Sequence, residues 1–291
     1  MNNPLILSGK DVSKHIYNGL RNRVTLLKEK GVTPGLAAIL IGDDPASVIY
    51  IKSKSRIFNQ LSLFVKTFKL PKDISQNNLI KLINDLNDDT TFHGILVQLP
   101  LPNHINSDII INTIKPEKDV DAFHPENVGL LTIGKPRYIP CTPKGIMCLL
   151  EHYEINLNGK HVVVLGRSNI VGRPISILTS LKSQFANATT TICHSRTKNI
   201  EEYTKNADVI IIALGVPEYL KRNMVKDEVI IIDVGINRID TDNNKGYKIV
   251  GDILWEDFID IAKAVTPVPG GVGPMTIAML AENTIEAAEN Y

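Results

Sequence analysis

Short runs of apolar and β-branched residues alternate along the chain with longer stretches that have the amphipathic pattern of helices. This alternation occupies the first half of the chain and starts again at residue 161. The later runs are typical of strands buried inside a parallel sheet. The pattern therefore predicts two α/β units in succession. The predicted strands are 35–41, 63–68 and 94–99 in the first unit and 161–165, 189–193, 209–213 and 229–234 in the second.

A segment with several prolines, 135–143, joins the two predicted units. Within it, Thr142 can cap a helix whose first turn contains Pro143. We place the domain boundary on this helix. The first domain then comprises residues 1–145 and the second comprises residues 146–274.

The end of the chain combines a shaped loop with a final helix. Residues 266–274 include three prolines and three glycines, a composition that excludes a regular element. Residues 275–291 are apolar at helical spacing, and Thr276 can cap this helix. The predicted fold class is α/β, with two α/β domains and a cleft between them. The second domain is a Rossmann-type parallel sheet, and the C-terminal helix packs back on the first domain.

Composition limits the classes of function that fit this chain. The 32 Lys and Arg residues balance 31 Asp and Glu residues, which argues against the broad basic surface of a nucleic-acid-binding protein. No segment has the roughly 20 apolar residues of a membrane span. Cys141, Cys148 and Cys193 lack the spacing of a disulfide framework or a metal site. We expect a cytoplasmic protein with reduced thiols and no metal, in which Cys141 and Cys148 are small buried residues.

The first strand of the second unit leads into a glycine turn and then a helix. Gly166, Arg167 and Ser168 follow this strand directly, and Gly172 precedes Pro174 in the first turn of the helix. Backbone N–H groups at such a helix start bind phosphate, and glycine lets the ligand approach the chain closely. An ordinary tight connection between a strand and a helix also uses glycine. Arg167 favours the phosphate site, because a structural turn does not need a guanidinium group.

The ends of the later strands indicate which dinucleotide binds. A site for NAD usually has an Asp or Glu about 20 residues after the glycines, at the end of the next strand. Here that strand ends at Ser195 and Arg196, which can bind a 2′-phosphate, so the sequence favours NADP. A solvated Arg196 is the alternative. Gly215 and Ile236 follow two further strands and either line the nicotinamide end or belong to ordinary loops.

The first domain contains a group of polar residues suited to catalysis. Ser47, Tyr50 and Lys54 have the spacing that places side chains on one face of a helix. Many solvated helix faces carry such residues by chance. Gln98 supports a site, because it stands where an apolar strand ends. Residues 116–125 add acids and His124, and we interpret both His124 and His194 as hydrogen-bonded spectators.

Five motifs occur in a fixed order along the chain, and together they resemble one family. This is the bifunctional methylenetetrahydrofolate dehydrogenase/methenyltetrahydrofolate cyclohydrolase family, of the FolD type. Ala122 departs from the pattern, because most members have glycine after the aspartate. The motifs are Ser47-x-x-Tyr50-x-x-x-Lys54, Val97-Gln98-Leu99-Pro100-Leu101-Pro102, Lys118-Asp119-Val120-Asp121, Gly166-Arg167-Ser168-x-x-Val171-Gly172-x-Pro174 and Pro267-x-Pro269-Gly270-Gly271-Val272-Gly273-Pro274-Met275-Thr276.

The resemblance implies two reactions of one-carbon metabolism, which serve purine biosynthesis. NADP-dependent oxidation converts 5,10-methylenetetrahydrofolate to 5,10-methenyltetrahydrofolate, and hydrolysis then gives 10-formyltetrahydrofolate. The resemblance also implies a homodimer that binds neither nucleic acid nor a membrane. It makes Lys54 the central catalytic group and adds Tyr50, Gln98 and Asp121. The implied substrate-binding residues are Ser47, Tyr50, Gln98, Leu99, Pro100, Asp121, Pro269, Gly270 and Gly271, and the cofactor residues are Gly166, Arg167, Ser168, Ser195, Arg196, Gly215 and Ile236.

The residues themselves leave two other functions open. A related two-domain NADP dehydrogenase that acts on an amino or hydroxy acid would use Tyr50 and Lys54 on a carbonyl group. A catalytically silent NADP-binding regulator would use only the second domain. Assays with the two folate substrates distinguish these functions from the family's reactions.

Overall fold

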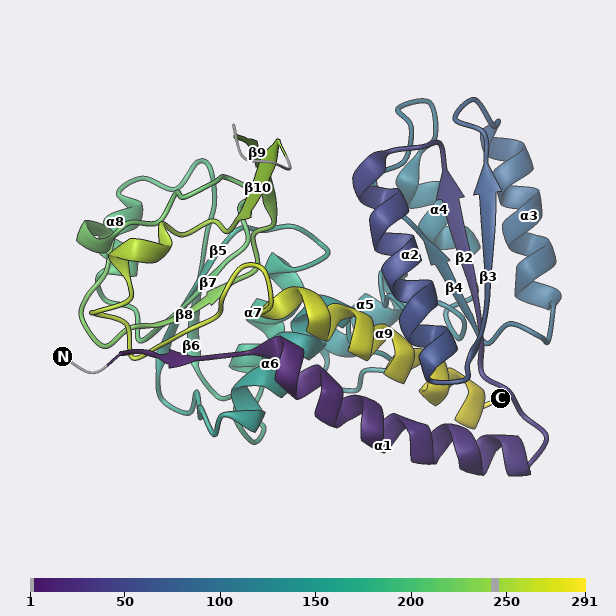
Figure 1. The fold of residues 1–291 in the computed structure, drawn as a ribbon, viewed down its shortest axis with the longest axis horizontal. Coiled ribbons are helices and arrows are strands. Elements are labelled where there is room, and N and C mark those ends of the chain that lie inside the picture. The colour runs from purple at the N-terminus through teal and green to yellow at the C-terminus, as the bar shows by residue number, and fades with distance from the viewer. Residues whose placement is uncertain (1–2, 242–245) are drawn as a thin grey trace. The chain divides into compact units, whose positions relative to one another are not determined.

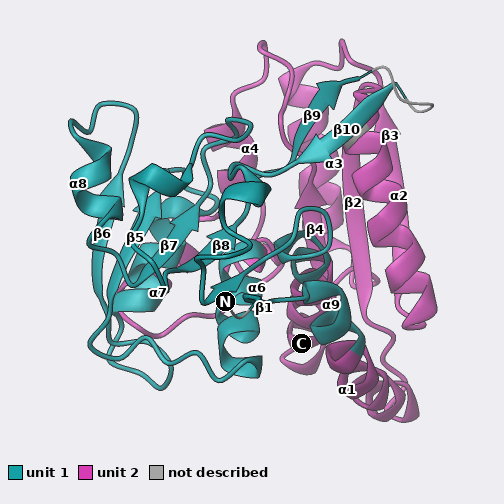
Figure 2. Cartoon of the chain, turned by 60° about the vertical axis from the view of Figure 1, so that its left-hand side comes forward, with its two compact units in different colours: residues 1–14, 142–276 teal, residues 15–141, 277–291 magenta. Residues whose placement is uncertain are grey.

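The computed structural model describes residues 3–241 and 246–291. The chain forms two compact units (Figure 2). Unit 1 comprises residues 1–14 and 142–276, and unit 2 comprises residues 15–141 and 277–291. Residues 3–14, which we expected in the first domain, therefore lie in unit 1 with residues of the second. The chain passes between the units within three helices, α1 (Gly9–Glu29), α6 (Cys141–His152) and α9 (Val272–Glu289).

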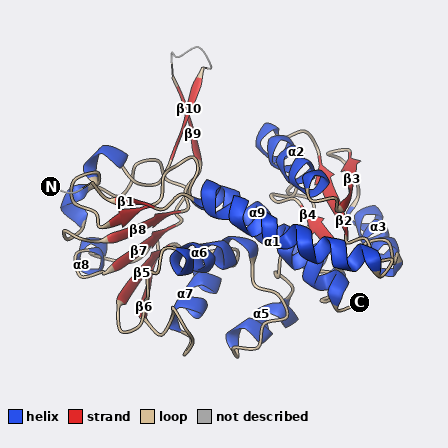
Figure 3. Cartoon of the chain, turned by 60° about the horizontal axis from the view of Figure 1, so that its bottom comes forward, coloured by secondary structure: helices blue, strands red, loops and turns tan. Residues whose placement is uncertain are grey.

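Unit 1 is built on a six-stranded sheet whose strand pairs are all parallel (Figure 3). The chain adds strands on one side of β5 and then on the other, which is the Rossmann-type arrangement that we predicted. The two-residue strand β1 was not predicted, because its pattern is too short to detect and its partner β11 is distant in sequence. The sheet order is β1 (Leu5–Ile6), β11 (Ala264–Val265), β8 (Ile230–Asp233), β7 (Val209–Ile212), β5 (His161–Leu165) and β6 (Thr189–Cys193).

Short helices and a hairpin connect the described strands of unit 1. Helix α7 packs against β5 and β6. The hairpin pairs β9 with β10 in antiparallel register. The bounds are α7 (Gly172–Ser180), α8 (Ile200–Thr204), β9 (Asn237–Asp240), β10 (Tyr247–Val250) and the 3₁₀ turns Arg222–Met224 and Trp255–Asp257.

Unit 2 is built on a parallel sheet in which β2 (Gly35–Ile41) is the central strand (Figure 1). Every residue of β2 is buried, as expected for a strand covered on both faces. Its outer neighbours are β3 (Phe64–Leu70) and β4 (Gly94–Val97). Helix α2 packs against β2 and β3, whereas α3 and α4 share a core with the other face of β2. The helices are α2 (Pro45–Gln60), α3 (Gln76–Asp88), α4 (Ser107–Thr113) and α5 (Pro125–Thr132).

The C-terminal part of α9 packs within unit 2, which confirms the predicted return of the last helix to the first domain. Asn283 is fully buried, and its amide donates hydrogen bonds to the carbonyl oxygens of Val120 (2.8 Å) and Ile139 (3.0 Å). Arg23 also forms a salt bridge with Glu289 at 2.6 Å.

The predicted helix caps Thr142 and Thr276 are wrong. Both residues lie inside their helices, because α6 begins at Cys141 and α9 begins at Val272. Their hydroxyl oxygens are 3.0 Å apart, so they bond to each other and not to free backbone N–H groups. The loop before α9 consequently ends at residue 271, three residues earlier than predicted.

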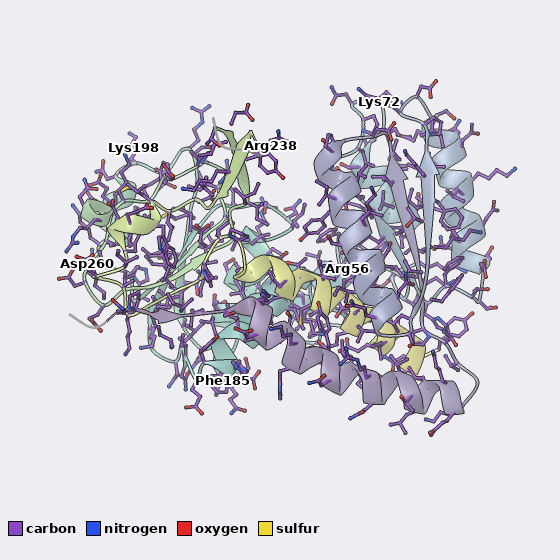
Figure 4. The ribbon with its side chains drawn as sticks, in the orientation of Figure 1. Arg56, Lys72, Phe185, Lys198, Arg238 and Asp260 are labelled. Carbon is purple, nitrogen blue, oxygen red and sulfur yellow. The ribbon has the colours of Figure 1, made fainter. Side chains whose placement is uncertain are left out.

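Charged side chains cover the outside of both units, as Lys72, Lys198 and Asp260 illustrate (Figure 4). This distribution agrees with the balanced charge of the sequence. Within the described residues, no helix has both the length and the apolar character that crossing a membrane requires.

Candidate active site

Helix α2 places three of the predicted residues on one face. The Asp44 carboxylate accepts a hydrogen bond from the Ser47 backbone N–H at 2.9 Å, and proline in the first turn fits the start of a helix. Ser47 and Lys54 are each only 6% exposed, and Tyr50 is half-buried. The alternative of a solvated face is therefore wrong for this helix.

The Lys54 amine has a fixed position. Its Nζ donates a hydrogen bond to Oε1 of Gln98 at 3.1 Å and lies 4.9 Å from the centroid of the Tyr50 ring. Gln98 is itself held, because its Nε2 donates to the Leu99 carbonyl oxygen (2.9 Å) and its backbone N–H donates to Ile39 (2.9 Å). Gln98 follows the last residue of β4 directly, at the strand end where the sequence predicted it.

Burial controls the charge of Lys54 and of Asp121. Burial lowers the pKa of Lys54, and the Asp121 carboxylate and Cys141 oppose this effect. Burial likewise raises the pKa of Asp121 to about 6, although the Lys54 charge acts to lower it. Both shifts favour the neutral forms, so this pair has the altered proton affinities that are typical of acid–base sites.

Cys141 is a further member of this cluster. Cys141 is buried, as predicted, whereas Cys148 is only partly buried, so that prediction is wrong. The Sγ of Cys141 lies 3.7 Å from Oδ1 of Asp121 and 3.6 Å from the Val120 carbonyl oxygen. The Asn283 amide approaches the same sulfur at 3.8 Å. The sequence did not reveal the contact between Cys141 and Asp121, because the two residues are 20 positions apart. The cysteine pattern showed only that no disulfide or metal spacing is present.

Two buried charged residues, Lys118 and Asp119, hold the turn that carries Asp121. The Lys118 amine donates hydrogen bonds to the carbonyl oxygens of Leu86 (3.0 Å) and Asp89 (2.7 Å). Oδ2 of Asp119 accepts hydrogen bonds from the His124 backbone N–H (2.7 Å) and from the Asn127 amide (2.8 Å). Burial raises the pKa of Asp119, while these hydrogen bonds lower it.

His124 has a structural position, in agreement with its interpretation as a spectator. Its Nδ1 lies 3.1 Å from the Glu126 backbone N–H, which places the imidazole at the start of α5. Ala122, the departure from the motif, adopts a φ of 60°. The left-handed turn that glycine usually provides is therefore kept with alanine.

In unit 1, the glycine turn after β5 is tightly packed. Gly166 has a φ of 123°, and a Cβ atom there would lie 2.5 Å from the Ala213 carbonyl oxygen. A Cβ atom on Gly172 would lie 2.2 Å from the Gly166 carbonyl oxygen. Oγ of Ser168 accepts hydrogen bonds from the backbone N–H groups of Val171 (3.1 Å) and Gly172 (3.3 Å). Arg167 and Ser168 are exposed.

The turn after β6 lies at the same edge of the sheet. The pairing of Leu165 with Cys193 aligns the carboxyl ends of β5 and β6, and the Gly166 N–H donates to the Cys193 carbonyl oxygen at 2.9 Å. Ser195 and Arg196 follow Cys193 and are exposed, and no Asp or Glu stands between residues 193 and 198. These turns fit a phosphorylated adenosine, because they combine free cations with close backbone approach.

The last two predicted cofactor residues stand after the next strands. Gly215 follows β7 with a φ of 67°. Ile236 follows β8 and is 58% exposed, which is unusual for a large aliphatic residue. The buried carboxylate of Asp252 accepts hydrogen bonds from the N–H groups of Leu214 and Gly215. Asp252 was missed from the sequence.

The loop before α9 uses its glycines for packing inside unit 1. The Gly270 carbonyl oxygen accepts a hydrogen bond from the Lys10 N–H at 3.0 Å, and the Gly271 N–H donates to Pro267 at 2.7 Å. A Cβ atom on Gly9 would lie 1.9 Å from the Gly271 carbonyl oxygen. Pro269 is exposed at the outer side of this loop.

Comparisons with known proteins agree with this arrangement. The family model described as "Tetrahydrofolate dehydrogenase/cyclohydrolase, catalytic domain" matches residues 7–121. The model of the same family's "NAD(P)-binding domain" matches residues 140–291. This chain belongs to the tetrahydrofolate dehydrogenase/cyclohydrolase family. The resemblance seen in the motifs is thereby confirmed.

Individual members of the tetrahydrofolate dehydrogenase/cyclohydrolase family match almost the whole chain. The "Bifunctional protein FolD" of Ligilactobacillus salivarius is 49% identical over 98% of this chain and 96% of its own length. A bifunctional FolD structure from Campylobacter jejuni is 48% identical, with a TM-score of 0.93 and 98% coverage of both chains. A FolD structure from Trypanosoma brucei, complexed with NADP and an inhibitor, is 35% identical, with a TM-score of 0.93 and coverage of 100% and 99%. Neither alternative function gains support from these relatives.

Proposed function

We propose that this member of the family oxidises 5,10-methylenetetrahydrofolate with NADP and hydrolyses the methenyl product to 10-formyltetrahydrofolate. The main support is the Lys54 amine, which is buried, held by Gln98 and close enough to Asp121 for their charges to interact. Burial lowers the pKa of this amine and so increases its neutral fraction, and the neutral amine can accept the proton that hydrolysis releases.

In the hydrolysis, water adds to the methenyl carbon, and a proton must leave that water. Lys54 in its neutral form accepts this proton, and its lowered pKa increases the neutral fraction. Oε1 of Gln98 orients the amine, because Nε2 of Gln98 is engaged by Leu99 and leaves the oxygen facing Lys54. The bond from this carbon to the ring nitrogen then breaks as the hydroxyl group of the adduct loses its proton to form the formyl C=O. The ring nitrogen takes up one proton, so the reaction releases one proton overall and gives the 10-formyl product.

The oxidation needs alignment more than proton transfer. The carbon that gives up hydride is bonded to two nitrogens whose lone pairs stabilise the resulting cation, so no acid or base is required. NADP supplies the hydride acceptor when it is bound. The residues of this chain hold and orient the reactants, with Tyr50 beside the folate and Asp121 accepting hydrogen bonds from the amino-pyrimidine edge.

Three exposed side chains support NADP as the cofactor of this chain. Arg167, Ser195 and Arg196 surround the aligned ends of β5 and β6 and can neutralise and hydrogen-bond a 2′-phosphate. A carboxylate in this position would repel that phosphate, and the segment contains none. The proposed cofactor residues are Gly166, Arg167, Ser168, Ser195, Arg196, Gly215 and Ile236.

The sequence motifs support the remaining folate contacts that we propose. Among the described residues, no group of three or more His, Cys, Asp or Glu side chains is arranged to hold a metal ion. The chemistry proposed above uses none. The proposed substrate-binding residues are Ser47, Tyr50, Gln98, Leu99, Pro100, Asp121, Pro269, Gly270 and Gly271.

We also propose that the chain acts in the cytoplasm as a homodimer. The family resemblance supports the dimer, and the cysteine pattern supports a reducing compartment. Size-exclusion chromatography with light scattering tests the dimer directly. A monomer at micromolar concentration would contradict it.

Spectrophotometric assays of both reactions on the purified chain test the main proposal. NADPH should form from NADP and 5,10-methylenetetrahydrofolate. Methenyltetrahydrofolate should be hydrolysed faster with enzyme than without it, even when NADP is absent. Failure of either reaction would refute the corresponding half of the proposed function.

A further inference from the structure

Two buried carboxylates that the mechanism does not use lie at the carboxyl ends of β7 and β8. Asp233 is 1% exposed and Asp252 is fully buried. Burial raises the pKa of Asp233 to about 6, with a contribution from the charge of Asp252. The hydrogen bonds described for both carboxylates come from backbone or amide N–H groups. Burial of a carboxylate is costly unless hydrogen bonds satisfy it, so these N–H groups are what keep both side chains in place.

Asp233 fixes the segment that carries Asp252. Its Oδ1 accepts hydrogen bonds from the N–H groups of Gly235 (2.8 Å) and Asp252 (3.0 Å), and its Oδ2 accepts one from Ile253 (3.1 Å). A Cβ atom on Gly251 would lie 1.8 Å from Oδ2 of Asp233. The backbone at Asp252 is thereby held against the end of β8.

Asp252 in turn ties together the two turns that follow β7 and β8. Its Oδ2 accepts hydrogen bonds from the N–H groups of Leu214 (2.7 Å) and Gly215 (2.9 Å). Its Oδ1 accepts one from the Asn237 amide at 2.8 Å. Asp252 therefore holds the backbone of the turn after β7 directly, and through the Asn237 side chain it anchors the end of the turn after β8.

The outer sides of these turns carry exposed apolar residues. Val216 is 45% exposed and Ile236 is 58% exposed. The ring of a dinucleotide in an open parallel sheet lies beyond the carboxyl ends of the strands, where these residues stand. Apolar side chains held at fixed positions suit a flat aromatic ring.

We propose that Asp252 is a positioning residue for the dinucleotide: it fixes the turns after β7 and β8, and these turns hold the nicotinamide half of NADP. This inference rests on the function proposed above. The adenosine half is bound by other turns, after β5 and β6. Loss of Asp252 should therefore weaken binding of the whole dinucleotide and spare a ligand that contains only the adenosine half.

Calorimetric titration with NADP and with adenosine 2′,5′-bisphosphate tests this separation. In Asp252→Ala the N–H groups of Leu214 and Gly215 lose their acceptor, so the dissociation constant for NADP should rise about tenfold or more. In Asp252→Asn the amide oxygen can still accept both bonds, but the Asn237 amide must rotate to accept the third and then loses its 3.2 Å bond to the Gly251 carbonyl oxygen. We expect a rise of only about threefold there. The bisphosphate should bind all variants equally.

Asp208→Asn is the matched control. Asp208 also accepts a backbone hydrogen bond, from His161 at 2.8 Å, but it lies at the opposite, amino end of β7. Its NADP affinity should equal that of wild type. The rate of methenyltetrahydrofolate hydrolysis without NADP is a second readout, and it should stay within twofold in all variants.

Two results would overturn the inference. Unchanged NADP affinity in Asp252→Ala would show that the turns do not need the carboxylate. Equal weakening of both ligands would show a general loss of the unit 1 fold. If Asp252→Ala does not fold, Asp252→Asn and Asn237→Ala take its place with the same two criteria. A wild type without NADP binding or folate turnover would instead refute the proposed function before any variant is compared.

Discussion

Replacement of Lys54 by methionine is the most direct test of the proposed hydrolysis. Methionine has a similar length and is apolar, so it can fill the buried position of the side chain, which is 6% exposed. The variant removes the amine that donates to Gln98 at 3.1 Å. We expect Lys54→Met to lose methenyltetrahydrofolate hydrolysis while it still oxidises 5,10-methylenetetrahydrofolate.

The size of the loss follows from the role of the amine. A positioned general base contributes about 10²- to 10⁴-fold to a rate, so kcat for hydrolysis should fall by at least about 100-fold. The oxidation requires no base, and its kcat should fall by less than about tenfold through altered folate alignment. Lys54→Arg should also lose hydrolysis, because a guanidinium group stays protonated and cannot accept a proton.

Both reactions can be followed in one spectrophotometer, from methenyltetrahydrofolate absorbance and from NADPH absorbance. Lys52→Met is the matched control, because Lys52 lies on the same helix two residues earlier and is exposed. Its two rates should equal those of wild type. For wild type, kcat for hydrolysis should rise with pH through a pKa that lies below the ordinary value of lysine.

Two results would refute this reasoning. Hydrolysis by Lys54→Met within about threefold of wild type would show that the amine is not the base. A wild-type rate that falls as pH rises through neutrality would show that the protonated amine is the active form. Parallel loss of hydrolysis and oxidation would instead indicate that Lys54 mainly holds the folate.

The remaining predictions test the site and the fold. Asp121→Asn should raise KM for the folate about tenfold. Because the pKa of Asp121 is raised to about 6, the folded state binds an extra proton between about pH 4 and pH 6, so wild-type stability should fall as pH rises through that window. Urea unfolding should show a smaller fall in Asp121→Asn. Arg167→Ala combined with Arg196→Ala should raise KM for NADP about tenfold or more and leave KM for NAD unchanged in steady-state assays, because NAD lacks the 2′-phosphate. Gly251→Ala should lower the unfolding free energy by about 1–3 kcal/mol, because its Cβ would meet Asp233. Gly19→Ala, exposed in helix α1 with no atom near its Cβ position, should raise it by about 0.5–1 kcal/mol, and urea unfolding measures both changes.

Sequence patterns predicted the parts of the fold that depend on local periodicity. Strand β2 is buried at all seven positions, and its apolar run matches the predicted range. Strand β4 ends at Val97, two residues before the prediction, and the prolines that follow at 100 and 102 have no backbone N–H to continue the ladder. Strand β1 could not be predicted, since its pairing with β11 joins residues almost 260 positions apart.

In the site, too, the sequence revealed residues at a regular spacing and did not reveal residues that bond to the backbone of distant segments. Lys54 and Gln98 were identified because helix spacing and a strand end are visible in the sequence, and their hydrogen bond is present. Asp233 and Asp252 were missed, because each accepts backbone N–H groups from segments brought together only by the sheet. A carboxylate that stabilises backbone turns has no residue partner at a fixed spacing, so no motif reveals it.

Ala122 explains why one departure from the family pattern leaves the site intact. A left-handed φ costs a non-glycine residue about 1–2 kcal/mol. The buried Asp119 carboxylate accepts two hydrogen bonds across the same turn, and a hydrogen bond to a charged group contributes about 1.5–3 kcal/mol. The Ala122 N–H also donates to the Asp119 carbonyl oxygen at 3.0 Å. These bonds hold the turn while Ala122 keeps the left-handed φ, so the conformation that presents Asp121 does not require glycine at this position.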